Sequence, residues 1–395
     1  MLRRPPLLFI FAVTLTGILN NTLISPAIPD ILEDFDIEAS GAGILVAAGS
    51  VAGIVMALVV GVLADRYGRR IVLTSCLAVF GVAGTLAAFA PSFGFLIGAR
   101  FLMGFGSAGL VNLAVVLIGD NWTGAERTEI VGRNAAVLTA GLAVFPLISG
   151  SVTKLAGWRV TLGLYTIAVV MAVVAWTILD GRRPEAPGRV RDQLRAVSRI
   201  ARDPGVRAAV TMGFLIFVLI FGAFLTVFPL HLAEEFGMDA AARGLMIGLP
   251  AVGSTVVAFN LGRMRRVFST RTVAVMGAVG FGVAFVTLGL ATAVFMAGIA
   301  VITYGAAEGL LIPALQDLAM EVSSDSDRGS IMALWVASAR LGQTIGPLLA
   351  GLALAFMGTG GALVAGSSIA ALLLLVALFG RLPKSDHRRD QATSG

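Results

Sequence analysis

Apolar stretches of about 20 residues recur along this 395-residue chain, and they constrain its fold more than any other feature. A helix of that length crosses roughly 30 Å of hydrocarbon. Only helices or closed barrels satisfy the backbone in lipid, and these stretches are too long for barrel strands. The mean hydropathy of +0.92 and the 13% share of charged residues exclude a soluble globular domain of this size. We expect an all-α integral membrane protein.

Twelve transmembrane helices are predicted from these stretches. The first is long, and no A-x-A site followed by a soluble domain accompanies it, so we expect a retained helix rather than a cleaved signal peptide. The spans lie near residues 7–29, 41–63, 71–90, 93–118, 132–153, 158–179, 208–231, 243–261, 272–290, 293–318, 330–356 and 361–380.

The positions of lysine and arginine predict the orientation. Basic residues gather on one side, in the first residues, in the loop at 66–70, in the 182–207 loop and in the tail. On the other side, the first loop carries five acids between Asp30 and Glu38 and no basic residue. By the positive-inside rule, both termini are expected in the cytoplasm of a plasma-membrane protein. The net charge of +6 therefore reflects topology, and no basic module that would bind nucleic acid is present.

The second half of the sequence repeats the first at an offset of about 201 residues. "FDIEASGAG" at Phe35 aligns with "FGMDAAARG" at Phe236, for example. We expect two pseudo-symmetric six-helix halves, residues 1–180 and 208–395, around a central cavity, with transport by rocking of one half against the other. A duplicated receptor or scaffold that transports nothing is the alternative. The joining segment, 181–207, is either an amphipathic helix on the inner leaflet or a solvated basic linker.

The loop "GVLADRYGRRIVL", residues 61–73, fits the pattern G-x-L-x-D-R-x-G-R-R-x-x-L throughout. Gly61 allows close helix approach, and Gly68 permits a tight turn. The arginines Arg66, Arg69 and Arg70 suit anionic headgroups. This loop resembles the signature of the major facilitator superfamily, which implies that superfamily's twelve-helix fold and a transport function.

The resemblance also implies a conformational lock. In that superfamily the equivalent of Asp65, with its neighbouring arginines, holds the halves together in the outward-facing state. The amino end of the eleventh span, near Gly329 and Ser330, is the expected partner because a helix dipole favours a carboxylate there. The related loop in the second half, from Gly262, carries Arg266 in place of the acid, so the lock is not symmetric.

Three further segments resemble motifs of this superfamily. "GRNAAVLTAGLAVFPLISG" in the fifth span is similar to a motif of drug/proton antiporters, although Phe145 and Ser149 replace glycines; small residues and proline also bend and pack a helix whatever the transport direction. "ARFLMGFGSAG" in the fourth span is similar to the motif that holds an intramembrane arginine, here Arg100. That residue is either functional or an arginine that snorkels to headgroups.

The fifth-span segment and its repeat in the second half define a predicted helix-bend motif. Its residues are Gly141, Pro146, Gly150, Gly346 and Pro347.

The segment "LNNTLISPAIP" in the first span is similar to a motif of drug exporters, with Asn20 where an aspartate is common. The change removes a titratable group. Asn20 and Asn21 either hydrogen-bond a substrate or join helices to one another.

Only Arg100, Glu308 and Arg340 are charged residues deep inside predicted spans. At ~1.5 Å per residue, Glu308 and Arg340 lie at one depth. Our first hypothesis makes Glu308 the proton carrier of an antiporter; a fixed salt bridge to Arg340 is the alternative. The second hypothesis uses the two arginines, with Gln343 beside them in the cavity, to recruit an anionic or zwitterionic substrate such as a lipid-like amphiphile.

Other classes of function find no support in the sequence. The single cysteine, Cys76, excludes a disulfide framework, and His231 and His387 are too few and too far apart for a metal site. No H-E-x-x-H, G-x-S-x-G or phosphate-binding loop occurs, so we expect no enzyme, no catalytic residue, no metal and no cofactor. We expect a proton-coupled efflux transporter, present as a monomer, whose partners are a small-molecule substrate, protons and membrane lipids.

Overall fold

The chain folds into helices throughout the part that the computed structural model describes, which comprises residues 4–181, 200–321 and 328–380. Within these ranges no strand is present. Residues 182–199 of the joining segment lie outside the described residues, and so does most of the amphipathic helix considered there.

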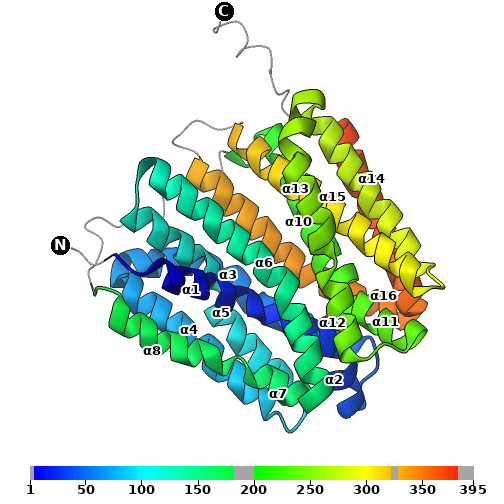
Figure 1. Cartoon of the computed structure of the whole chain (residues 1–395), viewed down its shortest axis with the longest axis horizontal. Coiled ribbons are helices and arrows are strands. Elements are labelled where there is room, and N and C mark those ends of the chain that lie inside the picture. Colours follow the sequence, from blue (N-terminus) through cyan, green and yellow to red (C-terminus); the bar gives the residue numbers. More distant parts are fainter. Residues whose placement is uncertain (1–3, 182–199, 322–327, 381–395) are drawn as a thin grey trace, which may run out of the picture.

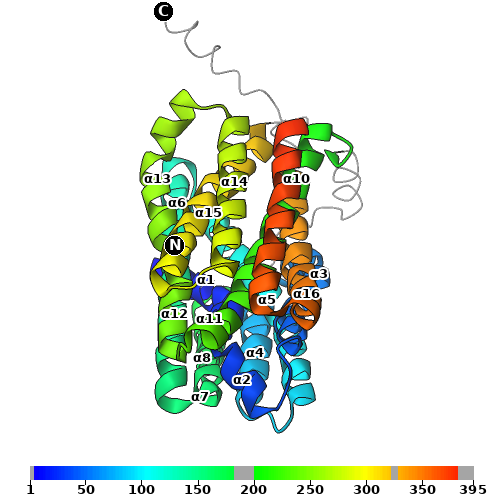
Figure 2. The same ribbon diagram turned by 90° about the vertical axis from the view of Figure 1, so that its right-hand side faces the viewer.

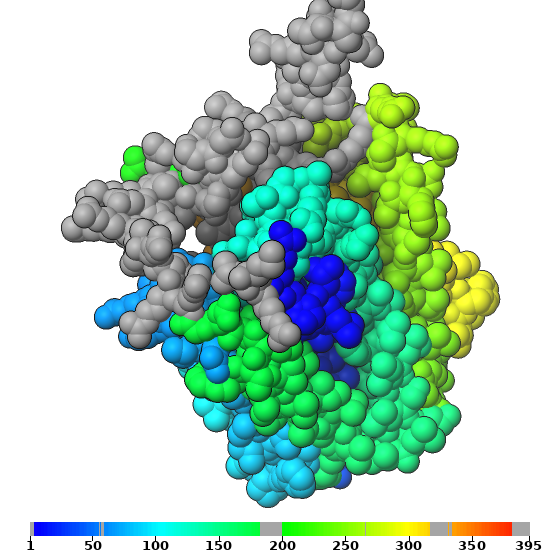
Figure 3. Space-filling view, turned by 60° about the vertical axis from the view of Figure 1, so that its left-hand side comes forward, coloured from blue at the N-terminus to red at the C-terminus, as the bar shows by residue number. Residues whose placement is uncertain are grey.

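The N-terminal half packs as one bundle. Its first helix is broken near Pro26 and continues after a short 3₁₀ turn, because proline cannot donate the hydrogen bond that a continuous helix needs. Its elements are α1 (Leu7–Thr22), η1 (Ser25–Ala27), α2 (Ile28–Asp34), α3 (Gly41–Tyr67), α4 (Arg69–Ala88), α5 (Phe93–Asn121), α6 (Gly124–Ala156), α7 (Trp158–Gly163) and α8 (Thr166–Ile178). Figure 3 shows part of α1 at the molecular surface between α6 and α8.

The C-terminal half forms the second bundle. Its first span contains a nine-residue π-helix, η2, an element often found at functional sites. The elements are α10 (Pro204–Val218), η2 (Leu219–Val227), α11 (Phe228–Phe236), α12 (Ala240–Gly248), α13 (Pro250–Val267), α14 (Thr270–Gly289), α15 (Val294–Glu321) and α16 (Arg328–Phe379).

The number of membrane passes fits the predicted twelve. Among the described residues, ten helices are long and apolar enough to cross a membrane, and α3, whose parts Gly41–Ile54 and Val59–Tyr67 are inclined by 47°, adds an eleventh. Helix α16 has 52 residues and a backbone break at Gly358, where φ is 65° and ψ is −177°. A helix of 52 residues would be about 78 Å long, more than twice the hydrocarbon thickness, so α16 comprises two passes.

The two ends of the bundle differ in charge, and we name them accordingly. The basic end carries Arg4, the loop between α3 and α4, and Arg271 at the start of α14; the acidic end carries Asp30 and Asp34 of α2. Figure 2 shows α2 and α7 at the lower, acidic end, while α10, α13 and α14 reach the upper, basic end. Basic residues on one side and an acidic first loop on the other are what the positions of lysine and arginine in the sequence predicted.

Candidate functional site

Glu308 lies in the middle of α15, one helical turn beyond Tyr304 and on the same face. The ring of Tyr304 is buried and stacks on Phe224 of the π-helix, with centroids 4.2 Å apart. The Glu308 side chain stays partly exposed, and among the described residues no base forms an ion pair with it.

Glycines place this carboxylate by letting α15 pack closely on α13. A Cβ at Gly305 would stand 2.0 Å from the carbonyl oxygen of Pro250, and one at Gly309 would stand 3.0 Å from the Cα of Ser254. Side chains at these positions would push the two helices apart. Glu308 is therefore held on a helix whose position is fixed by its neighbours.

Arg340 of α16 reaches the other half of the molecule. Its guanidinium donates to Oε1 of Gln343 at 3.1 Å and to the carbonyl oxygen of Ala108 in α5 at 3.5 Å. Both Arg340 and Gln343 are partly exposed. In this structure no ion pair joins Arg340 to Glu308, because Arg340 points toward α5 while Glu308 lies on the Tyr304 face of α15.

Arg100 is fully enclosed in the N-terminal half, with 0% of its surface exposed. It donates to the carbonyl oxygens of Leu45 at 3.1 Å and Asn20 at 2.9 Å, and to Oδ1 of Asn21 at 3.3 Å. The hydroxyl of Tyr165 donates to the same Asn20 oxygen at 3.1 Å. Arg100 thus joins α5 to α1 and α3, and its predicted contact with substrate stays a prediction.

The two asparagines of the first span differ in their surroundings. Asn20 is 3% exposed and donates from Nδ2 to the carbonyl oxygen of Gly49 at 2.9 Å, as the alternative of a helix-to-helix bond anticipated. Asn21 is partly exposed. Of the polar residues predicted for the cavity, Asn21, Glu308, Arg340 and Gln343 are partly exposed, whereas Asn20 and Arg100 are buried.

The helix-bend motif brings the two halves together at the acidic end. A Cβ at Gly244 of α12 would stand 2.3 Å from the carbonyl oxygen of Pro146 and 3.1 Å from the Cα of Gly150, both in α6. The repeat-related contact has the same form, because a Cβ at Gly43 of α3 would stand 2.5 Å from the carbonyl oxygen of Pro347 and 2.8 Å from the Cα of Gly351. The sequence offset of 201 residues links each residue of one contact to its counterpart in the other.

The other motif glycines pack within each half. A Cβ at Gly141 would stand 2.6 Å from the Leu15 side chain of α1. One at Gly346 would stand 2.6 Å from the carbonyl oxygen of Val218 in α10. The motif therefore serves two kinds of interface: helix packing inside each half, and contact between the halves.

A second contact between the halves centres on Arg243 of α12, a residue that the sequence did not single out as functional. Its guanidinium forms an ion pair with Asp30 of α2, donates to the carbonyl oxygen of Pro26 at 3.0 Å, and donates to that of Met238 at 2.8 Å. Arg243 is 4% exposed. We call Arg243, Asp30 and Pro26 the acidic-end clasp. The available signal was that Arg243 is one of the few basic residues on the side of the acidic first loop.

Two further bonds cross between the halves at the same end. Ser25 donates to the carbonyl oxygen of Leu225 at 2.8 Å. Lys154 lies 2.8 Å from Asp239, and this hydrogen bond, with that from the Ala242 amide, holds the pKa of Asp239 below its ordinary value. The acidic end is thus closed by several independent contacts.

At the basic end the same helices separate. Among the described residues, a Cβ at Gly61 of α3, at Gly132 of α6 or at Gly262 of α13 would meet nothing within 4 Å. Figure 1 shows α6 and α13 diverging away from α12, where α6 touches the C-terminal half. The halves are closed at the acidic end, and within the described residues α6 and α13 diverge toward the basic end.

The signature loop bonds within its own half in this state. Asp65 accepts from Arg69 at 2.6 Å, and Arg69 also donates to Asp120 of α5 at 3.0 Å. Arg66 lies against Tyr67, and the Arg70 guanidinium lies 4.1 Å from the ring centroid of Trp176. The expected partner of Asp65 is the start of α16 near Gly329 and Ser330, where the side chains are not among those described.

A family model described as the Major Facilitator Superfamily matches residues 10–231 and 210–395. The chain belongs to the Major Facilitator Superfamily. This finding confirms the resemblance predicted from the 61–73 loop, and with it the fold class. The protein is a membrane transporter of this superfamily, and its relatives are transporters rather than enzymes.

Individual members of the superfamily match most of the chain. The bacillibactin exporter of Bacillus subtilis (strain 168) is 22% identical over 350 residues, which cover 85% of this chain and 86% of the exporter. The class D tetracycline resistance protein of Salmonella ordonez is 27% identical over 399 residues, 96% of this chain and 98% of that protein. A bacterial homologue of the human lysosomal transporter Spinster, in an inward-facing and occupied conformation, shares the fold, with a TM-score of 0.76, 16% identity and coverage of 94% of this chain and 95% of that one.

Proposed function

We propose that this superfamily member exports small amphipathic compounds in exchange for protons, by alternating access. The observation that carries the proposal is the arrangement of the halves, which close on one another at the acidic end while the partly exposed Arg340 reaches from α16 to α5 of the other half. Such an arrangement is one extreme of a rocking cycle. Similarity to an exporter and to a resistance protein supports the outward direction.

The positive-inside rule gives this state its orientation. With the basic end in the cytoplasm, both termini are cytoplasmic, the protein lies in the plasma membrane, and the structure is the inward-open state. Residues 1–180 and 208–395 then move as the two bodies, joined by 181–207. Among the described residues Asp65 pairs with Arg69 of its own half, and we expect its lock to form when the transporter faces outward.

Glu308 is the group we assign to proton coupling. An antiporter needs one site at which proton and substrate exclude one another, and Glu308 is the deep acid among the described spans. In the inward-open state it gives up its proton as substrate enters, and it takes a proton from outside after release. Its position next to Tyr304 and the π-helix couples its charge to the span that must move.

A second candidate substrate class follows from Arg340. Its guanidinium donates to no carboxylate among the described residues, and the side chain remains partly exposed. An anionic or zwitterionic substrate, such as an organic acid or a lipid-like amphiphile, would supply the missing negative charge. In that case Arg340, Gln343 and Asn21 bind the substrate and Glu308 sets its position.

A growth-inhibition panel separates the two classes. An efflux-deficient host that produces the protein is exposed to tetracycline, to the cation ethidium and to anionic detergents, with Glu308→Gln and Arg340→Gln as variants. Protection against ethidium or tetracycline that needs Glu308 supports proton-coupled drug export. Protection only against anions, lost with Arg340→Gln, supports the second class. No protection and no accumulation difference for any compound would refute export of amphipathic compounds.

A further inference from the structure

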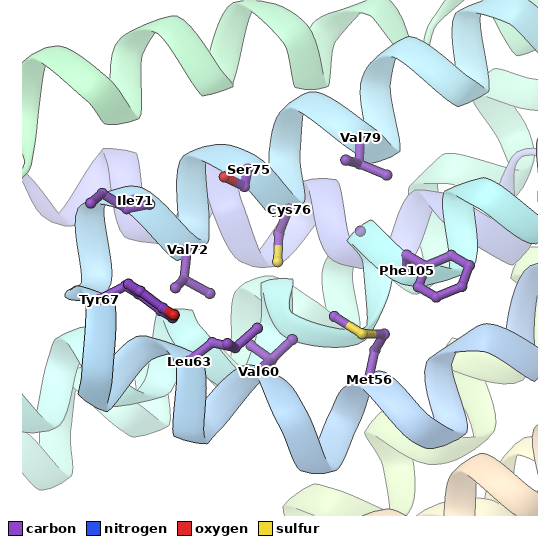
Figure 4. A pocket seen from close by; sticks show the side chains of 11 residues that line it. Met56, Val60, Leu63, Tyr67, Ile71, Val72, Ser75, Cys76, Val79 and Phe105 are labelled. Atoms are coloured by element: carbon purple, nitrogen blue, oxygen red, sulfur yellow. The ribbon is translucent and has the colours of Figure 1, made fainter. Parts of the chain in front are cut away.

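Two features lie away from the residues assigned to transport. One is an apolar crevice of about 300 Å³ between α3, α4 and α5, where Met56 and Val60 face Val72 and Cys76 (Figure 4), and its lining carries no charged side chain. The other is a buried polar cluster at the acidic end of the C-terminal half, where α11, the end of α14 and the break in α16 meet. Figure 1 shows α11 beside α16 at this end.

His231 of α11 lies at the centre of this cluster and is 3% exposed. The hydroxyl of Thr359, the residue that follows the break at Gly358, donates to Oε2 of Glu234 at 2.9 Å. Nδ1 of His231 lies 3.2 Å from the same hydroxyl oxygen. Because the hydroxyl directs its one hydrogen to Glu234, Nδ1 must be the donor of this second bond. The neutral ring therefore carries its proton on Nδ1.

The second ring nitrogen, Nε2, is buried and has no hydrogen-bond partner among the described residues. Backbone packs closely around the ring. A Cβ at Gly360 would stand 3.7 Å from Cε1 of His231, and one at Gly289 of α14 would stand 2.5 Å from the carbonyl oxygen of Gly360. A proton added to Nε2 in this packing would create a buried cation whose new N–H makes no hydrogen bond, which costs free energy. The proton binds better where water reaches Nε2.

The charged groups near the ring are Glu234 and Glu235, two exposed acids of its own helix. They favour a charged ring, but water screens exposed charges. From α14 the backbone carbonyl of Leu288 lies near the ring, and residues 341–379 of α16 include no charged side chain. Helices α2 and α12 also pack on α11. Their charged residues are Asp30 and Arg243, which pair with one another, Asp34, which pairs with Arg159, and the exposed Glu33.

Helix α11 connects this cluster to the contact between the halves. It packs on α16 within its own half and on α2 of the N-terminal half. It also directly follows the π-helix η2, in which the carbonyl oxygen of Leu225 accepts the bond from Ser25 of the other half. A displacement of α11 that lets water reach Nε2 therefore also disturbs the closed acidic end.

We propose that His231 is a second proton-binding site, distinct from Glu308, through which acid on the outside favours opening of the acidic end. The ring is neutral while this end is closed, and it binds a proton when α11 moves away from the break in α16. Because the proton binds the open arrangement better, it shifts the population toward that arrangement. The proposal rests on the proposed alternation of the two halves, but it involves neither Glu308 nor the transported compound.

Nitrogen NMR of the histidine ring tests the site directly. The chain has two histidines, so His387→Gln leaves the signal of His231 alone. In the full-length protein in lipid nanodiscs, we expect the neutral ring to carry its proton on Nδ1. Thr359→Val removes the hydroxyl and should abolish this preference, whereas Thr359→Ser should keep it. A neutral ring with its proton on Nε2 would contradict the proposal.

The distance between spin labels at Leu155 and Phe295, two exposed residues on different halves, tests the effect of the proton. A Glu308→Gln background removes the titration of Glu308. The pH is lowered from about 8 to about 5.5, across the ordinary pKa of histidine at about 6.5. One linked proton changes a population ratio by at most about tenfold per pH unit, and we expect the open population to rise about threefold or more. His231→Phe should abolish this response, and His387→Gln should keep it.

Asp30→Asn, which breaks the acidic-end clasp, is the reference for opening, and His231→Gln is the second variant if His231→Phe does not fold. If Asp30→Asn lengthens the distance and acid does not, the proton site is wrong while the alternation of the halves stands. If neither lengthens it, the alternation is wrong and this proposal falls with it. An acid response that persists in both His231 variants would assign the response to other acids at this end and would also overturn the proposal.

Discussion

Arg243 of α12 and Asp30 of α2 form an ion pair that joins the two halves of the transporter across their closed end. The pair is asymmetric in burial, since side-chain exposure is 5% for Arg243 and 38% for Asp30. Removing Asp30 would leave a buried guanidinium with backbone carbonyls as its only partners. The acidic-end clasp therefore favours the state in which the basic end is open.

Breaking the clasp should open the acidic end. We expect Asp30→Asn to weaken the closed contact by about 1–3 kcal/mol, the cost of leaving a buried polar group short of a partner, and so to shift the population by roughly 5- to 150-fold. Spin labels at the exposed residues Leu155 and Phe295, one on each half, report the change as a longer electron–electron distance.

Asp34→Asn is the control for that measurement. Asp34 pairs with Arg159 at 2.6 Å inside the N-terminal half, and both side chains are more than 40% exposed. Exposed pairs contribute little, and this one does not cross between the halves. Its loss should leave the distance unchanged. An unaltered distance in both Asp30→Asn and Arg243→Gln would show that the clasp does not set the closed state.

The glycine contact between α6 and α12 gives an independent prediction. A Cβ at Gly150 would stand 2.2 Å from the carbonyl oxygen of Ala240, so Gly150→Ala should prevent full closure of the acidic end. We expect the longer label distance and at least tenfold slower transport. Gly132→Ala in the same helix meets nothing within 4 Å and should not open that end; equal effects of the two changes would contradict the close-contact explanation.

Arg100 should behave as a structural residue of the N-terminal half. Arg100→Gln removes the guanidinium from the carbonyl oxygens of Leu45 and Asn20 and from Oδ1 of Asn21, while Tyr165 still donates to Asn20. Each buried group left without a donor costs about 1–3 kcal/mol. We expect a marked fall in melting temperature of the purified protein. Arg133→Gln, which removes an exposed pair with Glu129, should melt within a degree or two of the wild type. A wild-type melting temperature for Arg100→Gln would restore a substrate-binding role.

The sequence predicted the fold closely because each pass has its own apolar signal. The start of α5 at Phe93 and the second-half spans agree with the predictions to within a few residues. The offset of 201 residues places Gly43 and Gly244 at equivalent positions, and the structure shows that their contacts have the same form. The offset did not predict that these glycines meet the other half, because contacts between the halves depend on the state of the transporter.

Side-chain partners were harder to predict than depth. Arg340 and Glu308 were placed at one level, yet Arg340 bonds to the carbonyl oxygen of Ala108, and the direction of a side chain is not encoded in hydropathy. Backbone carbonyls are also the main acceptors of Arg100, and no sequence pattern identifies them. Arg243 lies near a helix end, where a basic residue is expected to face water.

Proton-driven transport by Glu308→Gln tests the central claim most directly. In proteoliposomes with an acidic lumen, the wild type should accumulate ethidium, and Glu235→Gln, which changes an exposed acid of the same half, should do the same. Glu308→Gln should reduce this accumulation at least tenfold, because the glutamine side chain does not ionise, while ethidium counterflow without a gradient continues. Accumulation by Glu308→Gln at the wild-type level would contradict the account.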